Sequence, residues 1–366
     1  MLGVGPTLHG FFWAATRWIP PGLAQPPFLA SLAEQFSIVP LSVSHTFGLE
    51  CLLGNSTKPV EFSFQVLRSE SAELEAWLSE WLKNSTPQTE PLWHKLLGLV
   101  TAWRRGGELW KNNLRSVWVE LDLPGNGQRP QPSIFLQLHC EKTHRSRQDF
   151  SDWLTGALLP LLGLPDLPLN TRTNLSRCLE FLPGDTVPLY LGCMLSRRAQ
   201  SLRTVPRQMK PSEIIPFLLC NGWPGTPLIL ETELAGLIAA ADFVYPALEI
   251  SETVSENVAF ECFAAGDKLD ALLDELTSRS LCTEAEAEGL RQFPGEIDHT
   301  EESSLWPNQI LNAASFLGPA YRSVVRRSIS HIKVNWADGK FTSSKAYLQL
   351  QHLWRSKKGY AVPVEH

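Results

Sequence analysis

The stretch from His331 to Leu350, HIKVNWADGKFTSSKAYLQL, has the alternation of apolar and polar residues that is typical of a β-hairpin. Apolar residues occupy every second position before and after a turn at residues 337–340. Because successive strand residues point to opposite faces, one face is apolar and the other is polar. An antiparallel hairpin of this kind can expose its polar face to water or line a cavity with it. The polar face carries His331, Lys333, Asn335, Lys345, Tyr347 and Gln349.

Four further pairs of strand-like segments precede this hairpin, and helix-like segments lie between the pairs. The expected strands cover residues 47–52 and 60–66, 118–123 and 133–139, 189–195 and 202–207, and 244–250 and 258–263. Helical periodicity is expected at residues 28–36, 74–82, 92–103, 150–158, 174–182, 212–221, 231–241, 268–276, 283–293 and in part of 305–317. The order helix, strand, strand, helix therefore recurs about five times, in units of roughly 55 to 90 residues without strong sequence identity.

Ten antiparallel strands with helices between the pairs can close into one barrel, and closure removes the exposed sheet edges. Helices would cover the outside, so the apolar strand faces point outward and the polar faces line the lumen. We therefore expect an α+β fold of five αββα repeats that form a ten-stranded antiparallel β-barrel with an outer ring of helices. The expected organisation is an N-terminal arm over residues 1–27, one barrel domain over residues 28–354 and a C-terminal tail over residues 355–366.

Composition excludes several classes of protein. The net charge of -6 over 366 residues argues against a general nucleic-acid binder, which would need a basic surface. No apolar run is long enough for a transmembrane helix, and the N-terminus lacks the charged start of a signal peptide. Seven dispersed cysteines are typical of reduced thiols, and no cysteine or histidine has zinc-ligand spacing. We expect a cytoplasmic protein with no metal, no cofactor, and no membrane or nucleic-acid partner.

Charged residues on the polar strand faces are the candidates for chemistry in the lumen. The acidic candidates are Glu50, Glu120, Asp122, Glu249 and Glu261. The basic candidates are Lys333, Lys345, Arg197, Arg203 and Arg207. Glu120, Asp122 and Trp118 share one strand face, and strand geometry places the Cα atoms of the two acids about 6.6 Å apart. A lumen with this many carboxylates holds a diphosphate poorly and suits a cationic or amide substrate better.

The expected architecture resembles that of the ABBA prenyltransferases, in particular the indole prenyltransferase branch. Residues 47–52 (FGLECL) and 58–64 (KPVEFSF) resemble the first hairpin of that family, and Lys345-Ala346-Tyr347 resembles its Lys-x-Tyr strands. The resemblance implies that Glu50 accepts the proton of an aromatic acceptor, that Lys345 binds diphosphate and that Tyr347 shields an allyl cation. It also implies a soluble enzyme that needs no metal.

Two functions are therefore expected, and they differ in the charge of the lumen. The first is a soluble aromatic prenyltransferase that transfers an allylic group from its diphosphate to an indole or peptide aromatic side chain, as in secondary metabolism or peptide modification. Lys333 and Lys345, with Arg203, would hold the diphosphate, while Tyr347 and Glu50 act as above. The alternative is a barrel without diphosphate binding that binds or modifies a peptide or small natural product in the lumen. Its acid/base and wall residues would be Glu120, Asp122, Glu261 and Trp118.

Overall fold

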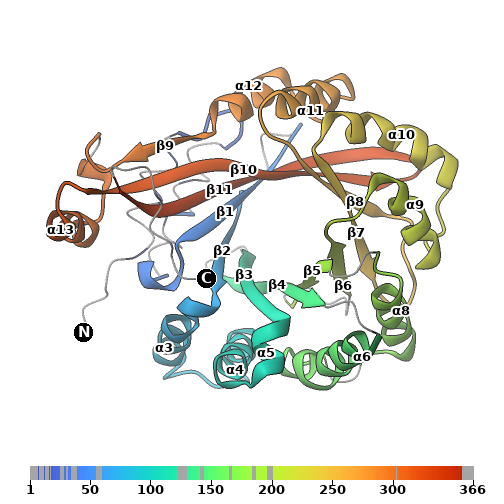
Figure 1. Cartoon of the computed structure of the whole chain (residues 1–366), viewed down its shortest axis with the longest axis horizontal. Helices are drawn as coiled ribbons and strands as arrows, with labels where there is room; N and C mark the ends of the chain where they lie inside the picture. The colour runs from blue at the N-terminus through green and yellow to red at the C-terminus, as the bar shows by residue number, and fades with distance from the viewer. Residues whose placement is uncertain are drawn as a thin grey trace.

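The computed structural model describes residues 39–54, 60–122, 130–140, 144–164, 167–183, 187–195, 201–301 and 303–356, with scattered residues before 39. Ten strands form one antiparallel barrel, in the order β1 to β8 followed by β10 and β11, and β11 closes the barrel against β1 (Figure 1). The predicted fold class is confirmed. The barrel strands are β1 (Thr46–Leu52), β2 (Glu61–Leu67), β3 (Leu114–Asp122), β4 (Gln131–Cys140), β5 (Val187–Cys193), β6 (Leu202–Pro206), β7 (Phe243–Ile250), β8 (Val258–Phe263), β10 (Tyr321–Ala337) and β11 (Lys340–Ser356).

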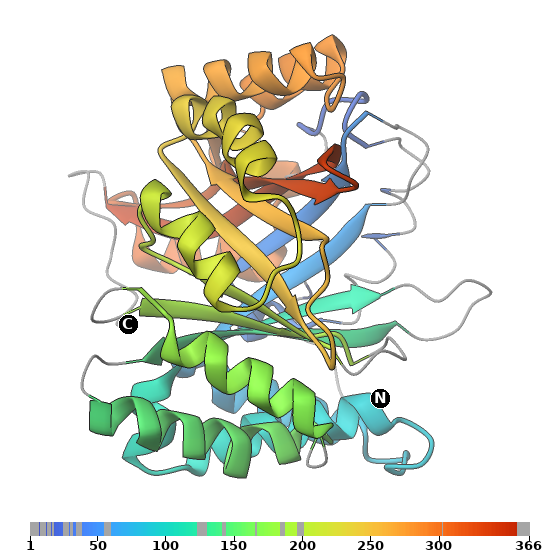
Figure 2. The same ribbon diagram turned by 90° about the vertical axis from the view of Figure 1, so that its right-hand side faces the viewer.

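Helices cover the outside of the barrel, with α3 to α8 along one side and α10 to α12 along the opposite side (Figure 2). The α-helices are α3 (Ser71–Trp81), α4 (Pro91–Arg105), α5 (Glu108–Asn113), α6 (His144–Trp153), α7 (Leu159–Leu161), α8 (Leu169–Glu180), α9 (Pro211–Cys220), α10 (Pro227–Ala240), α11 (Asp267–Ser278), α12 (Glu284–Gln292) and α13 (Asn308–Leu317). Short turns lie at η1 (Leu41–Val43), η2 (Arg68–Glu70), η3 (Leu154–Leu158) and η4 (Ser303–Leu305).

Strand β2 shows why the hydrophobic core lies between the barrel and its helices. Phe62, Phe64 and Val66 are fully buried on the outer face, and half-buried polar residues alternate with them on the lumen face. Burial of each large apolar side chain contributes roughly 1.5–3 kcal/mol, so this pattern fixes which face meets the helices. The polar faces of the strands are left to line the lumen, as the sequence predicts.

The start of α12 has a capping box, as the spacing of Thr283 and Glu286 at the start of the expected 283–293 helix predicts. The Thr283 hydroxyl accepts a hydrogen bond from the Glu286 amide at 3.2 Å, and Glu286 accepts one from the Thr283 amide at 2.8 Å. Glu286 also accepts hydrogen bonds from the backbone N–H of Gly54, just after β1. This single carboxylate therefore ties a helix of the outer ring to the first barrel strand.

The last hairpin is longer than predicted, because β10 and β11 each run for 17 residues. Only its tip half belongs to the barrel wall. The other half extends beyond the wall, where β10 pairs with β9 (Gly295–Asp298) (Figure 1). Arginines and serines interrupt the alternation in this half, so the sequence gives no strand signal there. Strand β11 includes Arg355 and Ser356, which the prediction assigned to the tail.

The expected strand at residues 202–207 contains Pro206, which cannot donate to a β-ladder, and such a strand is typical of a sheet edge or a loop. The structure places β6 inside the sheet, between β5 and β7. Pro206 is tolerated because β7 pairs with β6 only at Leu202 to Thr204, so the proline lies beyond that ladder. Arg207 follows directly after the strand.

The residues of the expected N-terminal arm and the 28–36 helix are described only in part, and residues 357–366 of the tail lie outside the described residues. No described helix is long and apolar enough to cross a membrane. Six cysteines are described, and all six are free thiols. Burial raises the pKa of Cys51, Cys178 and Cys193 to about 12, so these three thiols are inert core residues.

Candidate functional site in the barrel lumen

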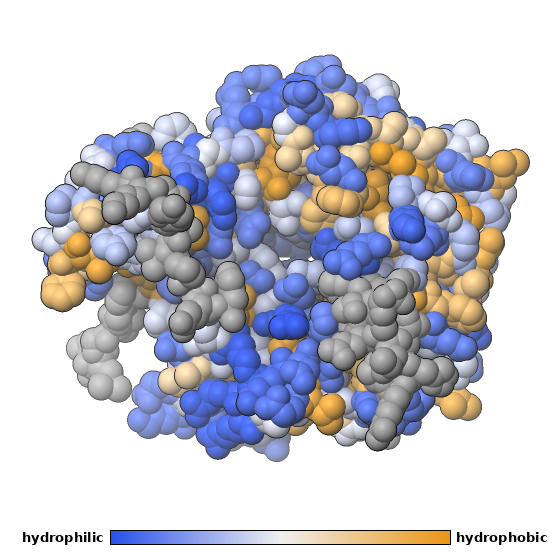
Figure 3. Space-filling model, viewed as in Figure 1, coloured by the Kyte–Doolittle hydropathy of each residue, from blue (hydrophilic) through white to orange (hydrophobic). Residues whose placement is uncertain are grey.

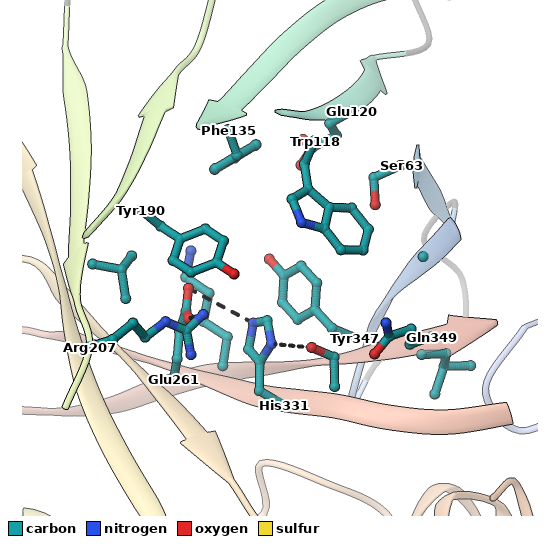
Figure 4. Close-up of a pocket in the computed structure, with 15 residues that line it drawn as sticks. Ser63, Trp118, Glu120, Phe135, Tyr190, Arg207, Glu261, His331, Tyr347 and Gln349 are labelled. Carbon is teal, nitrogen blue, oxygen red and sulfur yellow. Dashed lines mark hydrogen bonds and ion pairs between the residues drawn. The ribbon is translucent and has the colours of Figure 1, made fainter. Parts of the chain in front are cut away.

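A cavity of about 120 Å³ lies inside the barrel, and the face seen in Figure 1 is hollowed near its centre (Figure 3). At about 10–15 Å³ for each water-sized sphere, it has room for roughly ten non-hydrogen atoms. Rings form much of its wall, and those of Trp118, Tyr190 and Tyr347 point toward a common space (Figure 4). The cavity is therefore suited to one compact aromatic molecule.

Two glycines on the lumen face make room for rings in the cavity wall. A Cβ atom on Gly48 would lie 2.9 Å from the Ser63 hydroxyl and 3.6 Å from the Trp118 ring. A Cβ atom on Gly192 would lie 2.7 Å from the Phe135 ring. A larger residue would push the Ser63 hydroxyl at the first position and the Phe135 ring at the second, so these glycines help to set the shape of the cavity.

The first charged group lies where the first barrel strand meets the last. We name Glu50, Lys345 and Tyr347 the seam cluster. Glu50 of β1 pairs in register with Tyr347 of β11, and Lys345 is the next lumen-facing residue of β11. Lys345 donates a hydrogen bond to Glu50 within an ion pair, and the Tyr347 hydroxyl also bonds to Glu50. Both partners therefore hold this carboxylate.

The ion pair makes Glu50 a weak base. Burial by itself raises the pKa of Glu50, but the charges of Lys345 and Lys333 outweigh it and lower the pKa to about 2. Burial and the nearby Glu50 and Glu120 raise the pKa of the Tyr347 hydroxyl. A general base works best with a pKa near the working pH. In this arrangement Glu50 stabilises the barrel closure and has little tendency to take a proton.

The second charged group lies beside the first, on β8, on β10 and at the residue after β6. We name Arg207, Glu261 and His331 the cage cluster. An Arg207 Nη atom lies 3.0 Å from Glu261 Oε2. The Arg207 guanidinium carbon also lies 4.5 Å from the centre of the Tyr190 ring and 4.3 Å from that of Phe263. Aromatic faces and one carboxylate thus surround the guanidinium, which is a favourable cation–π environment.

His331 connects the cage cluster to the seam cluster. Its ring stacks on Tyr347 with 4.2 Å between the ring centres, and its Nδ1 atom lies 3.1 Å from the Ser330 hydroxyl. Burial lowers the pKa of His331 to about 4, so the ring is neutral at pH 7. The 3.8 Å approach of His331 Nε2 to Glu261 is then not an ion pair, and Arg207 is the charged partner of Glu261.

Two nitrogen atoms of the cage cluster are buried without a hydrogen-bond partner among the described residues. They are His331 Nε2 and Arg207 Nε, while Glu261 Oε2 makes the ion pair with Arg207 without hydrogen-bond geometry. Buried polar groups are nearly always hydrogen-bonded, so unsatisfied atoms beside a cavity indicate that a ligand or water completes them. The seam cluster has no such atoms among its described side chains.

Lys333 of β10 lies between the two clusters. It faces Lys345 across one strand pair and Glu261 across the other. Its side chain is only 6% exposed and lines the cavity, yet it makes no hydrogen bond or ion pair with another described residue. Burial, reinforced by the charge of Arg203, lowers the pKa of Lys333 to about 8.

The structure places most of the predicted site residues on the lumen face. Glu120, Trp118, Glu261, Lys333 and Tyr347 line the cavity, and Glu50 and Lys345 lie next to Tyr347 at its edge. Arg203, Asp122 and Arg197 are not among the described residues that line the cavity. Arg203 pairs in register with Glu249 of β7, while the Asp122 side chain and Arg197 lie outside the described residues.

The sequence did not single out Phe135 and Tyr190 as site residues, although both line the cavity. Each is the aromatic residue at a lumen-facing position of its strand, so strict alternation could have found them. The described residues bring no three metal-binding side chains together at one point. A resident metal ion therefore has no described ligand set.

No family model matches the sequence, and no curated protein matches it. Among the solved structures that match the chain are two proteins that cover nearly all of it. The 6-dimethylallyltryptophan synthase from Micromonospora olivasterospora, solved with DMASPP and Trp, is 11% identical with a TM-score of 0.47, over 96% of this chain and 98% of that chain. AnaPT from Neosartorya fischeri is 8% identical with a TM-score of 0.44, over 98% of this chain and 93% of that chain. This chain's own strand pairing shows the ten-stranded αββα architecture of the ABBA barrel.

Proposed function

We propose that the barrel binds one compact aromatic molecule in its lumen and acts on it by acid/base chemistry, without holding an allylic diphosphate. The charge of the lumen carries this proposal. Among the described residues of the lumen face, five glutamates accompany four cations, so there is no surplus positive charge for a diphosphate. These residues are Glu50, Glu61, Glu120, Glu249 and Glu261, and Arg203, Arg207, Lys333 and Lys345.

The pairing of these charges strengthens the argument. Lys345 is held by Glu50 and Arg207 by Glu261, so a diphosphate would have to displace a buried carboxylate from each of them. Displacement would leave that carboxylate unpaired in a poorly solvated place, which is costly. The cavity is also too small for a prenyl diphosphate and an indole together.

The cavity wall has groups that can move a proton. Glu120 provides a carboxylate, and the neutral His331 ring has an unsatisfied Nε2 atom. Burial raises the pKa of Glu261, but the neighbouring His331 and Arg207 lower it overall, so Glu261 stays ionised as the partner of Arg207. A neutral imidazole accepts or donates a proton according to what it meets. Aromatic walls from Trp118 and Tyr190 would hold the ring of the ligand beside these groups.

Thermal unfolding tests the choice of ligand. Indole at millimolar concentration should raise Tm by several degrees, because a ligand that binds only the folded state stabilises it. Inorganic diphosphate and dimethylallyl diphosphate should leave Tm unchanged. Phe135→Trp should abolish the indole shift by filling the cavity, while Phe316→Trp makes the same change on a side chain that is 92% exposed and should keep it. A shift with dimethylallyl diphosphate and none with indole would contradict the proposal.

Prenyl transfer is the second candidate, and one observation favours it. Lys345 and Tyr347 both bond to Glu50, which joins the three residues that the prenyltransferase resemblance implies. In this function a diphosphate would replace Glu50 on Lys345 and thereby release Glu50 as a base. Release of diphosphate from dimethylallyl diphosphate in the presence of indole, lost in Glu50→Gln, would support this candidate over the first.

A further inference from the structure

We propose that Lys333 is a nucleophilic amine that forms an imine with an aldehyde or ketone group of the ligand in the lumen. This inference rests on the proposed function, because it names the reacting group of the same bound molecule. It goes beyond acid/base chemistry, because the ligand becomes covalently attached to the protein for part of the reaction.

The position of Lys333 is the first argument. Its side chain is buried, lines the same cavity as Trp118, Tyr190 and Tyr347, and has no hydrogen-bond partner or ion-pair partner among the described residues. Lysine ammonium groups are rarely buried without a partner, because desolvation of the charge is expensive. Lys333 faces the cavity, so the bound ligand can supply the partner that its amine lacks.

Lys345 provides a comparison on the neighbouring strand. Lys333 and Lys345 are directly opposite in the β10–β11 ladder, so both belong to the lumen face. Lys345 is bound to Glu50, and although burial alone would lower the pKa of Lys345, Glu50 raises it. The same lumen thus holds one lysine as a fixed cation and leaves the other with its amine available.

The charges around Lys333 come from every strand that packs beside it. Burial and Arg203 lower the pKa of Lys333 to about 8, and these effects outweigh the opposing carboxylates. Relative to an ordinary lysine, a pKa of about 8 gives roughly 300-fold more free amine at neutral pH. A desolvated lysine beside another cation is a recognised form of activated amine. The surrounding groups are Arg203 of β6, Glu261 of β8, Glu50 of β1, Lys345 of β11, and His331 of β10 itself.

A carbonyl compound also fits the charge of the lumen. The free amine attacks the carbonyl carbon, the carbonyl oxygen takes a proton to give a carbinolamine, and loss of water then leaves the C=N bond of the imine. No anionic leaving group is released, so no surplus positive charge is needed. The protonated imine keeps the single positive charge of Lys333, so the balance with Glu261 and Glu50 is unchanged.

The dehydration step needs a proton donor and acceptor close to Lys333. The neutral His331 ring lies one lumen-facing position away on the same strand and can exchange this proton. Glu261, which pairs in register with Lys333 and whose pKa is lowered by the charges around it, stays ionised and stabilises the protonated imine. Water is the only other product, and its oxygen comes from the carbonyl group. His331 would therefore assist the covalent step by moving a proton, and it is not consumed.

Reductive trapping tests the inference. The full chain is incubated at pH 7 with 4-hydroxybenzaldehyde and sodium cyanoborohydride, which reduces an imine to a stable secondary amine. Intact mass spectrometry should show one adduct, and peptide mapping should place it on Lys333 at least about 100-fold faster than on the exposed Lys340 of the same hairpin. The rate should rise with pH and level off above a midpoint near 8, which no unactivated lysine would give.

Two variants control the result. Lys333→Met should lose the adduct, and Lys340→Arg, an exposed change in the hairpin turn, should keep it. If Lys333→Met does not fold, the peptide map and the pH midpoint of the unaltered chain still decide. An adduct spread over exposed lysines, or none at Lys333, would overturn the inference.

A ligand without the carbonyl group separates the two proposals. 4-Hydroxybenzyl alcohol has the same ring and cannot form an imine. If it raises Tm while the aldehyde is not trapped on Lys333, the proposed binding function stands and the imine is refuted. If neither compound raises Tm and no adduct forms, both proposals fail.

Discussion

The seam cluster and the cage cluster are two charged groups in one lumen, and they differ in how completely they are satisfied. In the seam cluster, Glu50 is bonded to both Lys345 and Tyr347, across the strand pair that closes the barrel. In the cage cluster, His331 Nε2 and Arg207 Nε are buried without a hydrogen-bond partner among the described residues. All three members of the cage cluster line the cavity, whereas Tyr347 alone of the seam cluster does.

This difference separates a structural role from a chemical one. Glu50 and Lys345 are 295 positions apart in the chain, and their ion pair joins the first barrel strand to the last. A fully paired group is well suited to fix that closure, and a partly satisfied group is where a ligand gains hydrogen bonds. A charged residue on the lumen face is therefore not by itself a reactive residue, because the charges of the seam cluster are fully paired.

The largest effect is expected when one charge is removed from the seam cluster, which tests its structural role. Glu50→Gln leaves Lys345 without its carboxylate and should lower the free energy of unfolding by about 3 kcal/mol. We expect the lower end of the range for buried pairs, because Lys345 keeps 31% of its side chain exposed. Urea unfolding measures the change.

The matched control is Glu80→Gln, which breaks the exposed ion pair with Lys83 on the outer surface and should change stability by less than about 0.5 kcal/mol. Under folding conditions Glu50→Gln should still bind indole. A stable Glu50→Gln protein that has lost indole binding would reverse the assignment of the two clusters.

The two clusters should lose their contributions to stability in different pH ranges. The folded pKa of His331 is about 4 against an ordinary 6.5, so the unfolded chain binds the proton first and stability falls as pH drops through this interval. The loss between pH 7 and pH 5 should be about 2 kcal/mol from His331. The folded pKa of Glu50 is about 2 against 4.5, so its contribution is lost only below about pH 4.5.

His331→Phe keeps a ring against Tyr347 and removes the titration. It should make stability between pH 7 and pH 5 flatter by about 2 kcal/mol, while Glu50→Gln should leave this window unchanged. His352 provides an internal reference, because burial lowers its pKa to about 3 and its contribution remains in both variants. An unchanged slope in His331→Phe would show that the ring is not buried in its neutral form.

The strands were predictable because the parts of them that form the barrel wall alternate between an outer apolar face and a lumen face. Elements without that signal were missed, namely α5, which is six residues long, and β9, which is four. The outer half of β10 was missed because neither of its faces is continuously apolar. Periodicity needs both length and an amphipathic face, and these segments lack one or the other.

The site was predictable only as a set of lumen-facing residues. Alternation placed Lys333 and Lys345 on one face, but it could not say that Glu50 holds one of them and leaves the other. That pairing depends on the register between β1 and β11, which lie at opposite ends of the chain. The burial that sets the pKa of Lys333 likewise comes from several strands at once, so no local sequence signal contains it.

The smallest expected effect is that of Gly192→Ala, which changes the aromatic wall of the cavity beside Arg203. In Gly192→Ala the new Cβ atom would lie 2.7 Å from the Phe135 ring and 3.3 Å from the Arg203 Cβ atom. The ring must move toward the cavity, so we expect a loss of about 1 kcal/mol in stability and roughly tenfold weaker indole binding. Calorimetry and urea unfolding measure the two changes.

The control is Gly98→Ala in α4, where the added Cβ meets nothing within 4 Å and alanine favours the helix. Its stability should therefore stay equal or rise by up to about 1 kcal/mol. If Gly192→Ala binds indole as tightly as the unaltered chain, the ligand does not lie against the Phe135 wall, and the seam cluster becomes the better place to look for it.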